Sequence, residues 1–270
     1  MKGQGYIGVL IIILVIAAIF FLTGGNFQQF VQPSEAGIVS GRGLTITLSY
    51  DTIIKPKETF NLKVEITNRG EFDVKDCEVS LLGFSSDWTL NGKSFTGASK
   101  HIDIIKKDDT ETIRWKLKAP TYELSYPFIV KVVYPYETEY KGLFKVVSES
   151  YAEEKEDEGA IIDEKTSVGP LSVSIKPEDN FILDDTEIPI EVTITNIGGG
   201  DIDGLIQLTG TPSIYCYTGF VEIDPTTNSA KVDCELIPGK VSEFKNLFAS
   251  LNLTYTYQIE AEGMVEVSSE

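Results

Sequence analysis

Few side chains in this 270-residue sequence are of the types that carry out chemistry. It contains a single histidine, His101, and three cysteines. One histidine leaves no room for a histidine-rich metal site, and any catalytic group that uses an imidazole must include it. His101 stands in a polar stretch with no nucleophile at a spacing that suggests pairing. We therefore interpret it as a solvated loop residue, and we expect no enzyme activity and no cofactor.

Neighbouring carboxylates are the other candidates for chemistry. They occur at Asp108-Asp109, at Asp184-Asp185, and at Asp201 with Asp203. General acid–base catalysis needs two carboxylates held across a cleft in contrasting environments, whereas these pairs are typical of turns. Asp201 and Asp203 follow the glycines at 198–200, and we keep them as a weak calcium candidate. No Lys-Ser/Thr motif follows these glycines, so they predict no phosphate-binding loop.

The cysteines predict structure and not catalysis. Cys216 and Cys234 are separated by 18 residues. Outside the cell they could form a disulfide, which would stabilise the fold by about 3 kcal/mol in the chain-entropy model. The alternative is a pair of buried thiols. Cys77 shares strand parity with Val79 and Leu81, which favours a buried free thiol over an intermolecular disulfide.

Two further features concern the surface. Asn252-Leu253-Thr254 is the one N-glycosylation sequon, and both Asn252 and Thr254 fall on the polar parity of an expected strand, so we expect the site to be accessible. Outward tyrosine rings stack well on sugars or proteins, but half-buried strand positions are the simpler interpretation. The tyrosines concerned are Tyr122, Tyr126, Tyr134, Tyr136 and Tyr140.

The N-terminal segment, residues 1–25, predicts a membrane helix. The run from Tyr6 to Leu22 is uncharged, and with its flanking glycines it approaches the roughly 20 residues that span a bilayer. Lys2 precedes the run and the acidic bulk follows it, which predicts a cytoplasmic N-terminus and an extracellular C-terminal part. An uncleaved signal anchor is the default interpretation. A cleaved signal peptide would need an A-x-A-like site, which residues 23–25 match poorly.

A third interpretation of this segment rests on a resemblance. Lys2-Gly3-Gln4, followed at once by the apolar run, resembles the class III signal of archaeal type IV pilin-like proteins. The resemblance covers residues 2–22 and implies cleavage between Gly3 and Gln4, with the hydrophobic helix retained. Residues 26–43 are then a polar stalk.

A duplication organises the remainder of the chain. Residues 66–70 (ITNRG) recur as residues 194–198 (ITNIG), at an offset of 128. The preceding residues, 60–67 and 188–195, alternate between apolar and polar side chains, which predicts strands with one buried face. Asn-x-Gly then supplies a turn in each copy. Shorter strands are expected before each motif, at 44–50 and 171–177.

Further apolar segments complete each copy. They lie at 77–82, 112–118, 126–134 and 142–147 in the first, and at 205–210, 230–236, 244–251 and 253–261 in the second. Short strands with frequent turns over ~100 residues predict an all-β fold: two tandem immunoglobulin-like antiparallel β-sandwiches, at 44–148 and 168–270. Residues 149–167 carry eight acids and two lysines, which predicts a self-repelling, extended linker and not a calcium-binding hinge. A short helix through residues 151–158 is an alternative, because Glu and Lys are good helix formers.

The first copy resembles a known class of surface module. A strand, the ITN-x-G motif, Asp87-Trp88, Lys118-Ala119-Pro120 and Tyr126-Pro127 are similar to CARDB-type and NEW3-type immunoglobulin-like domains of archaeal and bacterial S-layer-associated and secreted proteins. The second copy lacks the Trp and the Ala-Pro. The resemblance implies display at the cell surface and a role in binding or spacing.

The charge narrows the choice of partners. The sequence has 23 Lys+Arg and 41 Asp+Glu, a net charge of −18, which argues against nucleic acid. We expect a membrane-anchored cell-surface protein with a binding, adhesion or envelope-structural role, whose partners are the membrane and a protein or glycan. Alternatives are a pilin-like subunit of a surface filament and an accessory module of an extracellular enzyme complex.

Overall fold

The computed structural model describes residues 34–39, 42–154, 160–177, 182–184 and 186–269. The chain divides into two units, residues 1–34 and residues 35–270, and the strands and sheets belong to the second unit. The expected cleavage site at Gly3 and Gln4 and the expected membrane helix from Tyr6 to Leu22 lie outside the described residues. Within the described ranges, no helix combines the length and the apolar character that crossing a bilayer requires.

The predicted all-β class with antiparallel sandwich packing is confirmed, and three sheets build it. Sheet A belongs to the first copy of the repeat. In spatial order it contains β1 (Ser34–Val39), β2 (Leu44–Tyr50), β4 (Thr59–Asn68), β9 (Thr110–Lys118), β6 (Thr89–Leu90) and β7 (Lys93–Ser94). Sheet C belongs to the second copy and contains β12 (Leu171–Pro177), β14 (Ile188–Asn196), β18 (Ser229–Leu236) and β16 (Ile214–Cys216).

Sheet B is common to both copies. Its order is β17 (Phe220–Val221), β15 (Asp201–Gly210), β19 (Phe244–Val267), β10 (Ser125–Val147), β5 (Val74–Leu82) and β8 (Ala98–Ile105). β11 (Ile161–Thr166) and β13 (Ile182–Leu183) also pair with β10, and β3 (Ile53–Ile54) pairs with β19. The helix α2 (Glu149–Glu154) follows β10.

Alternating burial explains why these segments form strands. In β4, Phe60, Leu62, Val64 and Ile66 are buried, whereas the residues between them are exposed or half-buried. A period of two places all four apolar side chains on one face, where they form the core. β14 repeats this pattern in the second copy. Removing these side chains from water is the main favourable contribution to the fold.

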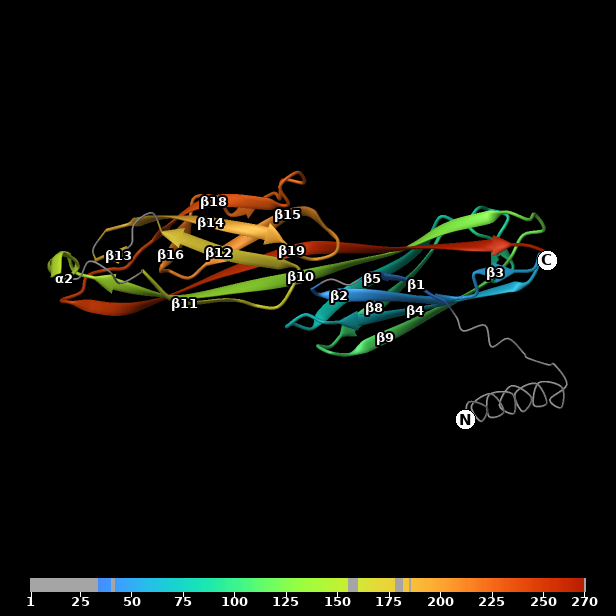
Figure 1. Ribbon diagram of the computed structural model, residues 1–270, viewed down its shortest axis with the longest axis horizontal. Helices are drawn as coiled ribbons and strands as arrows, with labels where there is room; N and C mark the ends of the chain where they lie inside the picture. The colour runs from blue at the N-terminus through green and yellow to red at the C-terminus, as the bar shows by residue number, and fades with distance from the viewer. Residues whose placement is uncertain (1–33, 40–41, 155–159, 178–181, 185, 270) are drawn as a thin grey trace, which may run out of the picture. The chain divides into compact units, whose positions relative to one another are not determined.

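The two long strands β10 and β19 run through both sandwiches (Figure 1). They pair antiparallel without a register break, from Ser125 opposite Glu266 to Val147 opposite Phe244. The beginning of β10 pairs with β5 of the first copy, and its end pairs with β11 and β13 of the second. The beginning of β19 pairs with β15 of the second copy, and its end pairs with β3 of the first. Each long strand therefore starts in its own copy and ends in the other.

This exchange differs from the expected organisation of two sandwiches separated by a linker. The segments expected as separate strands at 126–134 and 142–147 are one strand, as are those at 244–251 and 253–261. Pro135 does not interrupt β10, because it lies between the residues paired with β5 and those paired with β11. Proline is tolerated where a strand has a neighbour on one side only.

Two segments expected to be irregular also contain paired strands. Part of the expected acidic linker, 149–167, forms α2 and β11, and β11 pairs with β10 from Tyr140 to Phe144. Part of the expected stalk, 26–43, forms β1 beside β2. Pairing satisfies backbone groups that an open strand edge would leave exposed, and this outweighs the charge repulsion of the acidic segment.

We predict that neither copy folds alone. Residues 34–154 and residues 160–270, produced separately, each lack the partner of their long strand. Size-exclusion chromatography and two-dimensional NMR should show each fragment as aggregated or unfolded. Co-expression should give a one-to-one complex whose spectrum matches the intact chain. A cooperative thermal transition of either fragment alone, near that of the intact chain, would contradict the exchange of strands.

Candidate functional site

A cluster of four tyrosines marks the centre of the β10–β19 pair. Tyr134 pairs with Tyr257 and Tyr136 with Tyr255, on either side of Pro135 opposite Thr256. All four rings are buried, and each lies 5.9–6.2 Å from the next in a closed ring of contacts. Edge-on aromatic pairs at this distance are favourable beyond the area they bury. The tyrosines therefore join the two sandwiches at their common sheet.

The hydroxyls of this cluster are hydrogen-bonded within the fold. Tyr136 Oη donates to the carbonyl of Val168 at 3.1 Å, and Tyr255 Oη shares a hydrogen bond of 2.8 Å with Thr138. Tyr257 Oη donates to Asn196 Oδ1 at 2.9 Å. Burial raises the pKa of each of these three tyrosines, so the rings stay neutral across the physiological range. They are structural groups and not catalytic ones.

The Asn-x-Gly repeat closes the loops that pack on these tyrosines. Asn68 Nδ2 donates to the carbonyl of Phe72 at 2.8 Å, and the amide of Gly70 donates to Asn68 Oδ1 at 2.9 Å. Asn196 makes the same two bonds to Gly200 and Gly198, at 2.8 and 3.1 Å. A Cβ at Gly70 would overlap Tyr136 Oη, and a Cβ at Gly198 would overlap Tyr257 Oη. In both copies the Asn-x-Gly motif therefore shapes a loop that packs closely against a tyrosine of the cluster.

We predict that Gly70→Ala lowers the free energy of unfolding by about 1–3 kcal/mol, because it forces the Tyr136 hydroxyl to move. Tyr136→Phe alone should cost about 1 kcal/mol, because it removes the hydrogen bond to Val168. The double variant should cost less than the sum of the two single costs, because the shortest of the overlaps, that with the Tyr136 hydroxyl, is removed. Gly219→Ala is the control, since no atom lies within 4 Å of its Cβ position. If urea unfolding shows that the costs of Gly70→Ala and Tyr136→Phe are additive, the contact between Gly70 and the Tyr136 hydroxyl is rejected.

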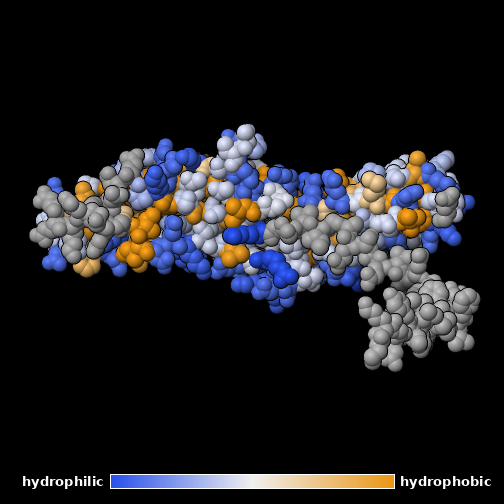
Figure 2. Space-filling view, viewed as in Figure 1, coloured by the Kyte–Doolittle hydropathy of each residue, from blue (hydrophilic) through white to orange (hydrophobic). Residues whose placement is uncertain are grey.

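A groove of about 870 Å³ lies over the outer face of sheet B, across the centre of the β10–β19 pair. Its floor is formed by Pro135 and Glu137 of β10 with Thr254 and Thr256 of β19. One wall is the loop and strand start with Glu71, Phe72, Asp73 and Lys75, and the other wall carries Leu205, Gln207 and Phe220. On the face drawn in Figure 2, hydrophobic residues form small separate groups among hydrophilic ones.

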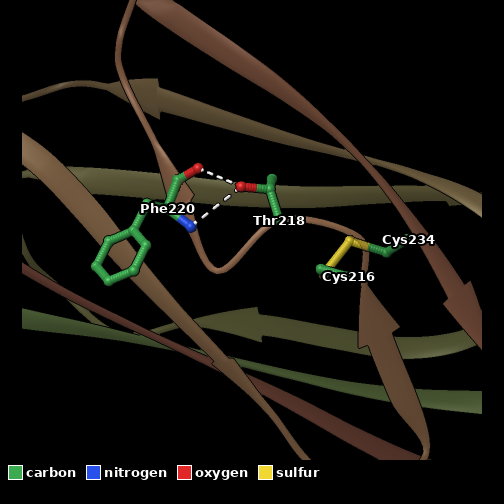
Figure 3. The surroundings of a disulfide bond; sticks show 4 residues. All are labelled: Cys216, Thr218, Phe220 and Cys234. Atoms are coloured by element: carbon green, nitrogen blue, oxygen red, sulfur yellow. Dashed lines mark hydrogen bonds between the residues drawn. A yellow bond between two sulfur atoms is a disulfide. The ribbon is translucent and has the colours of Figure 1, made fainter.

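A disulfide between Cys216 and Cys234 closes a chain segment that includes Phe220 of the groove wall. It joins β16 to β18, with a separation of 18 residues along the chain. Figure 3 shows the turn after Cys216, in which Thr218 Oγ1 accepts from the amide of Phe220 at 3.2 Å and donates to its carbonyl at 2.6 Å. The Phe220 ring is directed away from the disulfide and lines the groove. Phe220 itself pairs with Gln207 of β15, which fixes its place in the wall.

We predict that reducing this disulfide lowers the free energy of unfolding by about 3 kcal/mol, the chain-entropy value for a loop of this size. Urea unfolding with and without reductant measures the difference, and alkylation followed by mass spectrometry shows that the bridge has opened. The Cys216→Ser/Cys234→Ser variant should match the reduced protein and should not respond to reductant. An unchanged midpoint after complete reduction would contradict a stabilising role.

The remaining sequence candidates do not gather into a reactive site. Burial raises the pKa of the Cys77 thiol to about 12, so it stays protonated and unreactive. His101 lies on strand β8 opposite Glu78, so the loop interpretation is wrong: the polar side chains around it face outward from an edge strand. Its ring nitrogens lie 3.4–3.8 Å from carboxylate oxygens of Asp76, Glu78 and Asp103.

Asp201 and Asp203 lie at the start of β15, opposite Gln258 and Thr256 of β19. Within the described ranges, no three histidine, cysteine, aspartate or glutamate side chains are grouped to hold a metal ion, and calcium binding at this pair stays a prediction. Asn252 is half-buried in β19, between β10 and β15, with Oδ1 enclosed and unbonded. Thr254 is exposed as expected. Asn252 was expected on the exposed face of the strand as well, but the neighbouring strands leave it half-buried.

The residues that line the groove were not predicted as a site. Phe220 stands in the sequence between two expected strands, and nothing there shows that it faces Glu137. Its exposed fraction of 56% is unusual for phenylalanine and is the signal that the structure adds. Among the clustered tyrosines, Tyr122 is exposed, whereas Tyr126, Tyr134 and Tyr140 are buried.

Comparisons with known proteins find only distant structural similarity. No protein-family model and no curated protein matches the chain, so the CARDB-type, NEW3-type and S-layer resemblance has no support from a family model. The C-terminal globular domain of an oligosaccharyltransferase from Pyrococcus abyssi is 12% identical with a TM-score of 0.35, covering 90% of this chain and 56% of that one. Red sea bream transglutaminase is 10% identical with a TM-score of 0.24, covering 84% and 31%. Trypsin-activated α2-macroglobulin from Escherichia coli is 8% identical with a TM-score of 0.21, covering 83% and 18%.

Proposed function

We propose that this chain is a non-catalytic protein of the cell surface, anchored by its N-terminal apolar segment, whose two sandwiches act together as one stiff binding arm. The observation that carries the proposal is the unbroken pairing of β10 with β19 through both sandwiches. At about 3.3 Å per residue, the 23 residues of β10 extend over about 75 Å. Bending this arm at its centre would break ladder hydrogen bonds and separate the buried tyrosines.

Two features of the chain support an extracellular location. The Cys216–Cys234 disulfide is of a kind that persists in oxidising compartments and is rare in the cytosol. The apolar run from Tyr6 to Leu22, with Lys2 before it, favours the orientation in which the sandwiches are outside. We assign no reaction to the chain, because the Cys77 thiol is buried and its raised pKa keeps it protonated.

A second candidate is a pilin-like subunit, and one specific observation favours it. Lys2-Gly3-Gln4 stands immediately before the apolar run, at the position where class III signals are cut. In this alternative the N-terminal helix packs into a filament and the sandwiches form its exterior. Both candidates place the groove and the disulfide outside the cell.

Surface labelling of intact cells tests the location. A membrane-impermeant amine reagent should modify exposed lysines of the sandwiches, such as Lys116 of β9 and Lys231 of β18, without cell lysis. A cytoplasmic protein in the same cells is the control and should be labelled only after lysis. Labelling of Lys116 and Lys231 that needs lysis would reject a cell-surface protein.

N-terminal sequencing of the native protein separates the two candidates. A mature chain that begins at Met1 supports the simple anchor. A chain that begins at Gln4 supports the pilin-like alternative, and a chain that begins after Leu22 rejects an anchor in both.

A further inference from the structure

The groove over the centre of sheet B has the composition of a binding site for a positively charged segment. Among the described residues that line it, Glu71, Asp73 and Glu137 are acidic, and Lys75 carries the one positive charge. Its volume of about 870 Å³ falls within the roughly 300–1,000 Å³ of ligand-binding clefts. The walls add aromatic and aliphatic surface to these charges.

Two of the carboxylates are held in place by backbone amides. Glu71 Oε2 accepts from the amide of Val168 at 3.0 Å, and Asp73 Oδ1 accepts from the amide of Lys107 at 2.9 Å. The hydrogen bond from Val168 lowers the pKa of Glu71, so this carboxylate stays charged at neutral pH. Each bond uses one oxygen and fixes the direction of the side chain. The other oxygen of Glu71, Oε1, lies 3.8 Å from Nζ of the exposed Lys165, which a cationic ligand would displace. A ligand that pairs with these groups therefore loses little free energy in ordering them.

The apolar side chains of the groove suit the stem of a lysine or arginine. Phe220 and Leu205 are more than half exposed, and Phe72 is half-buried with its ring 6.5 Å from that of Tyr136. An ammonium or guanidinium group is attracted to an aromatic face, and the methylene groups next to it cover apolar surface. Gln207, Thr254 and Thr256 add hydrogen-bonding groups to the floor and wall.

The second copy of the repeat lacks this arrangement, although the loops are equivalent. Where the first copy has Glu71-Phe72, the second has the glycines at 199–200. A Cβ at Gly200 would overlap the carbonyl of Gln258, so this loop packs directly on β19. Both copies therefore have the Asn-x-Gly loop against the tyrosine cluster. Only the first copy adds the charged and aromatic residues that form a wall of the groove.

We propose that this groove binds an extended, lysine- or arginine-containing segment of a partner protein. The inference rests on the proposed non-catalytic binding function and names the partner class for it. A second copy of this chain is a poor occupant, because its net charge of −18 matches the sign of the groove. Anionic polymers and anionic lipid headgroups are disfavoured for the same reason.

Titration of the whole ectodomain, residues 26–270, with a short peptide of alternating lysine and serine tests the proposal. Calorimetry should show saturable one-to-one binding that weakens as salt is raised from 0.1 M to 1 M, where the Debye length falls from about 10 Å to about 3 Å. Glu137→Gln should weaken binding about two- to fivefold, as for a partly exposed charge pair. Phe220→Ala should weaken it by a similar factor, through loss of the cation–π contact.

Matched variants of β19 outside the groove distinguish binding in the groove from an effect of the protein's overall charge. Glu262→Gln removes an exposed carboxylate of β19, and Phe248→Ala removes an exposed aromatic ring of β19 outside the groove. Both should bind the peptide as the unmodified protein does. Equal weakening in groove and control variants, or equal binding of a glutamate–serine peptide or a neutral oligosaccharide, would overturn the proposal. Surface labelling is independent of these outcomes, so failure here is distinguishable from failure of the proposed function.

Discussion

The antiparallel pairing of β10 with β19 is the constraint on which the rest of the described fold depends. Each strand contributes its two ends to different sandwiches, so neither core is complete without both strands. The short strands β3 and β13 repeat this relation, since each pairs in parallel with the end of the long strand from the other copy. Because these contacts are reciprocal, the sandwiches fold as one body and not as two domains on a linker.

The centre of this pair shows what the two copies kept and what they changed. Both retain an asparagine that closes a loop and a glycine that accommodates a tyrosine hydroxyl. These contacts hold the loops against the shared sheet and tolerate little variation, because the interior is close-packed. The loops differ in the next two positions, where Glu71-Phe72 stands in the first copy. That difference, together with Phe220 beside the disulfide, forms the walls of the groove.

Local pattern was sufficient to predict the amphipathic strands of each core. It missed polar strands such as β8 and β11, and it did not show which strands continue. The alternation in 60–67 and 188–195 identified β4 and β14 and the face that each buries. In β10 the same alternation passes through Pro135 and Glu137, which lie between the strands expected at 126–134 and 142–147. Neither residue is buried, and on the side of β10 away from β19 neither has a partner strand. A proline and a charge are therefore accommodated, and the strand continues. Alternation reports the buried face of a strand and says nothing of its partner.

The groove could not be predicted for the same reason. Glu71, Glu137, Leu205 and Phe220 are distant in sequence and meet only because β17, β15, β19 and β10 are adjacent in sheet B. The register that aligns them depends on a break in the β15–β19 pairing between Asp203 and Gln207. Such a bulge re-aims the side chains beside it. Gly204, with a φ of 90°, lies within the bulge, and an isolated glycine in a strand was the one signal of its position in the sequence.

Amide hydrogen exchange along β10 and β19 tests the continuity of this pair most directly. If the two strands form one continuous pair, the amides within 134–140 and 252–257 that donate across the β10–β19 ladder exchange as slowly as the ladder amides within 129–133, which lie in the first sandwich. Exchange of these central amides many times faster than that of 129–133, at a rate close to that of an unpaired loop, would show a hinge between two independent sandwiches and would contradict a single folded body.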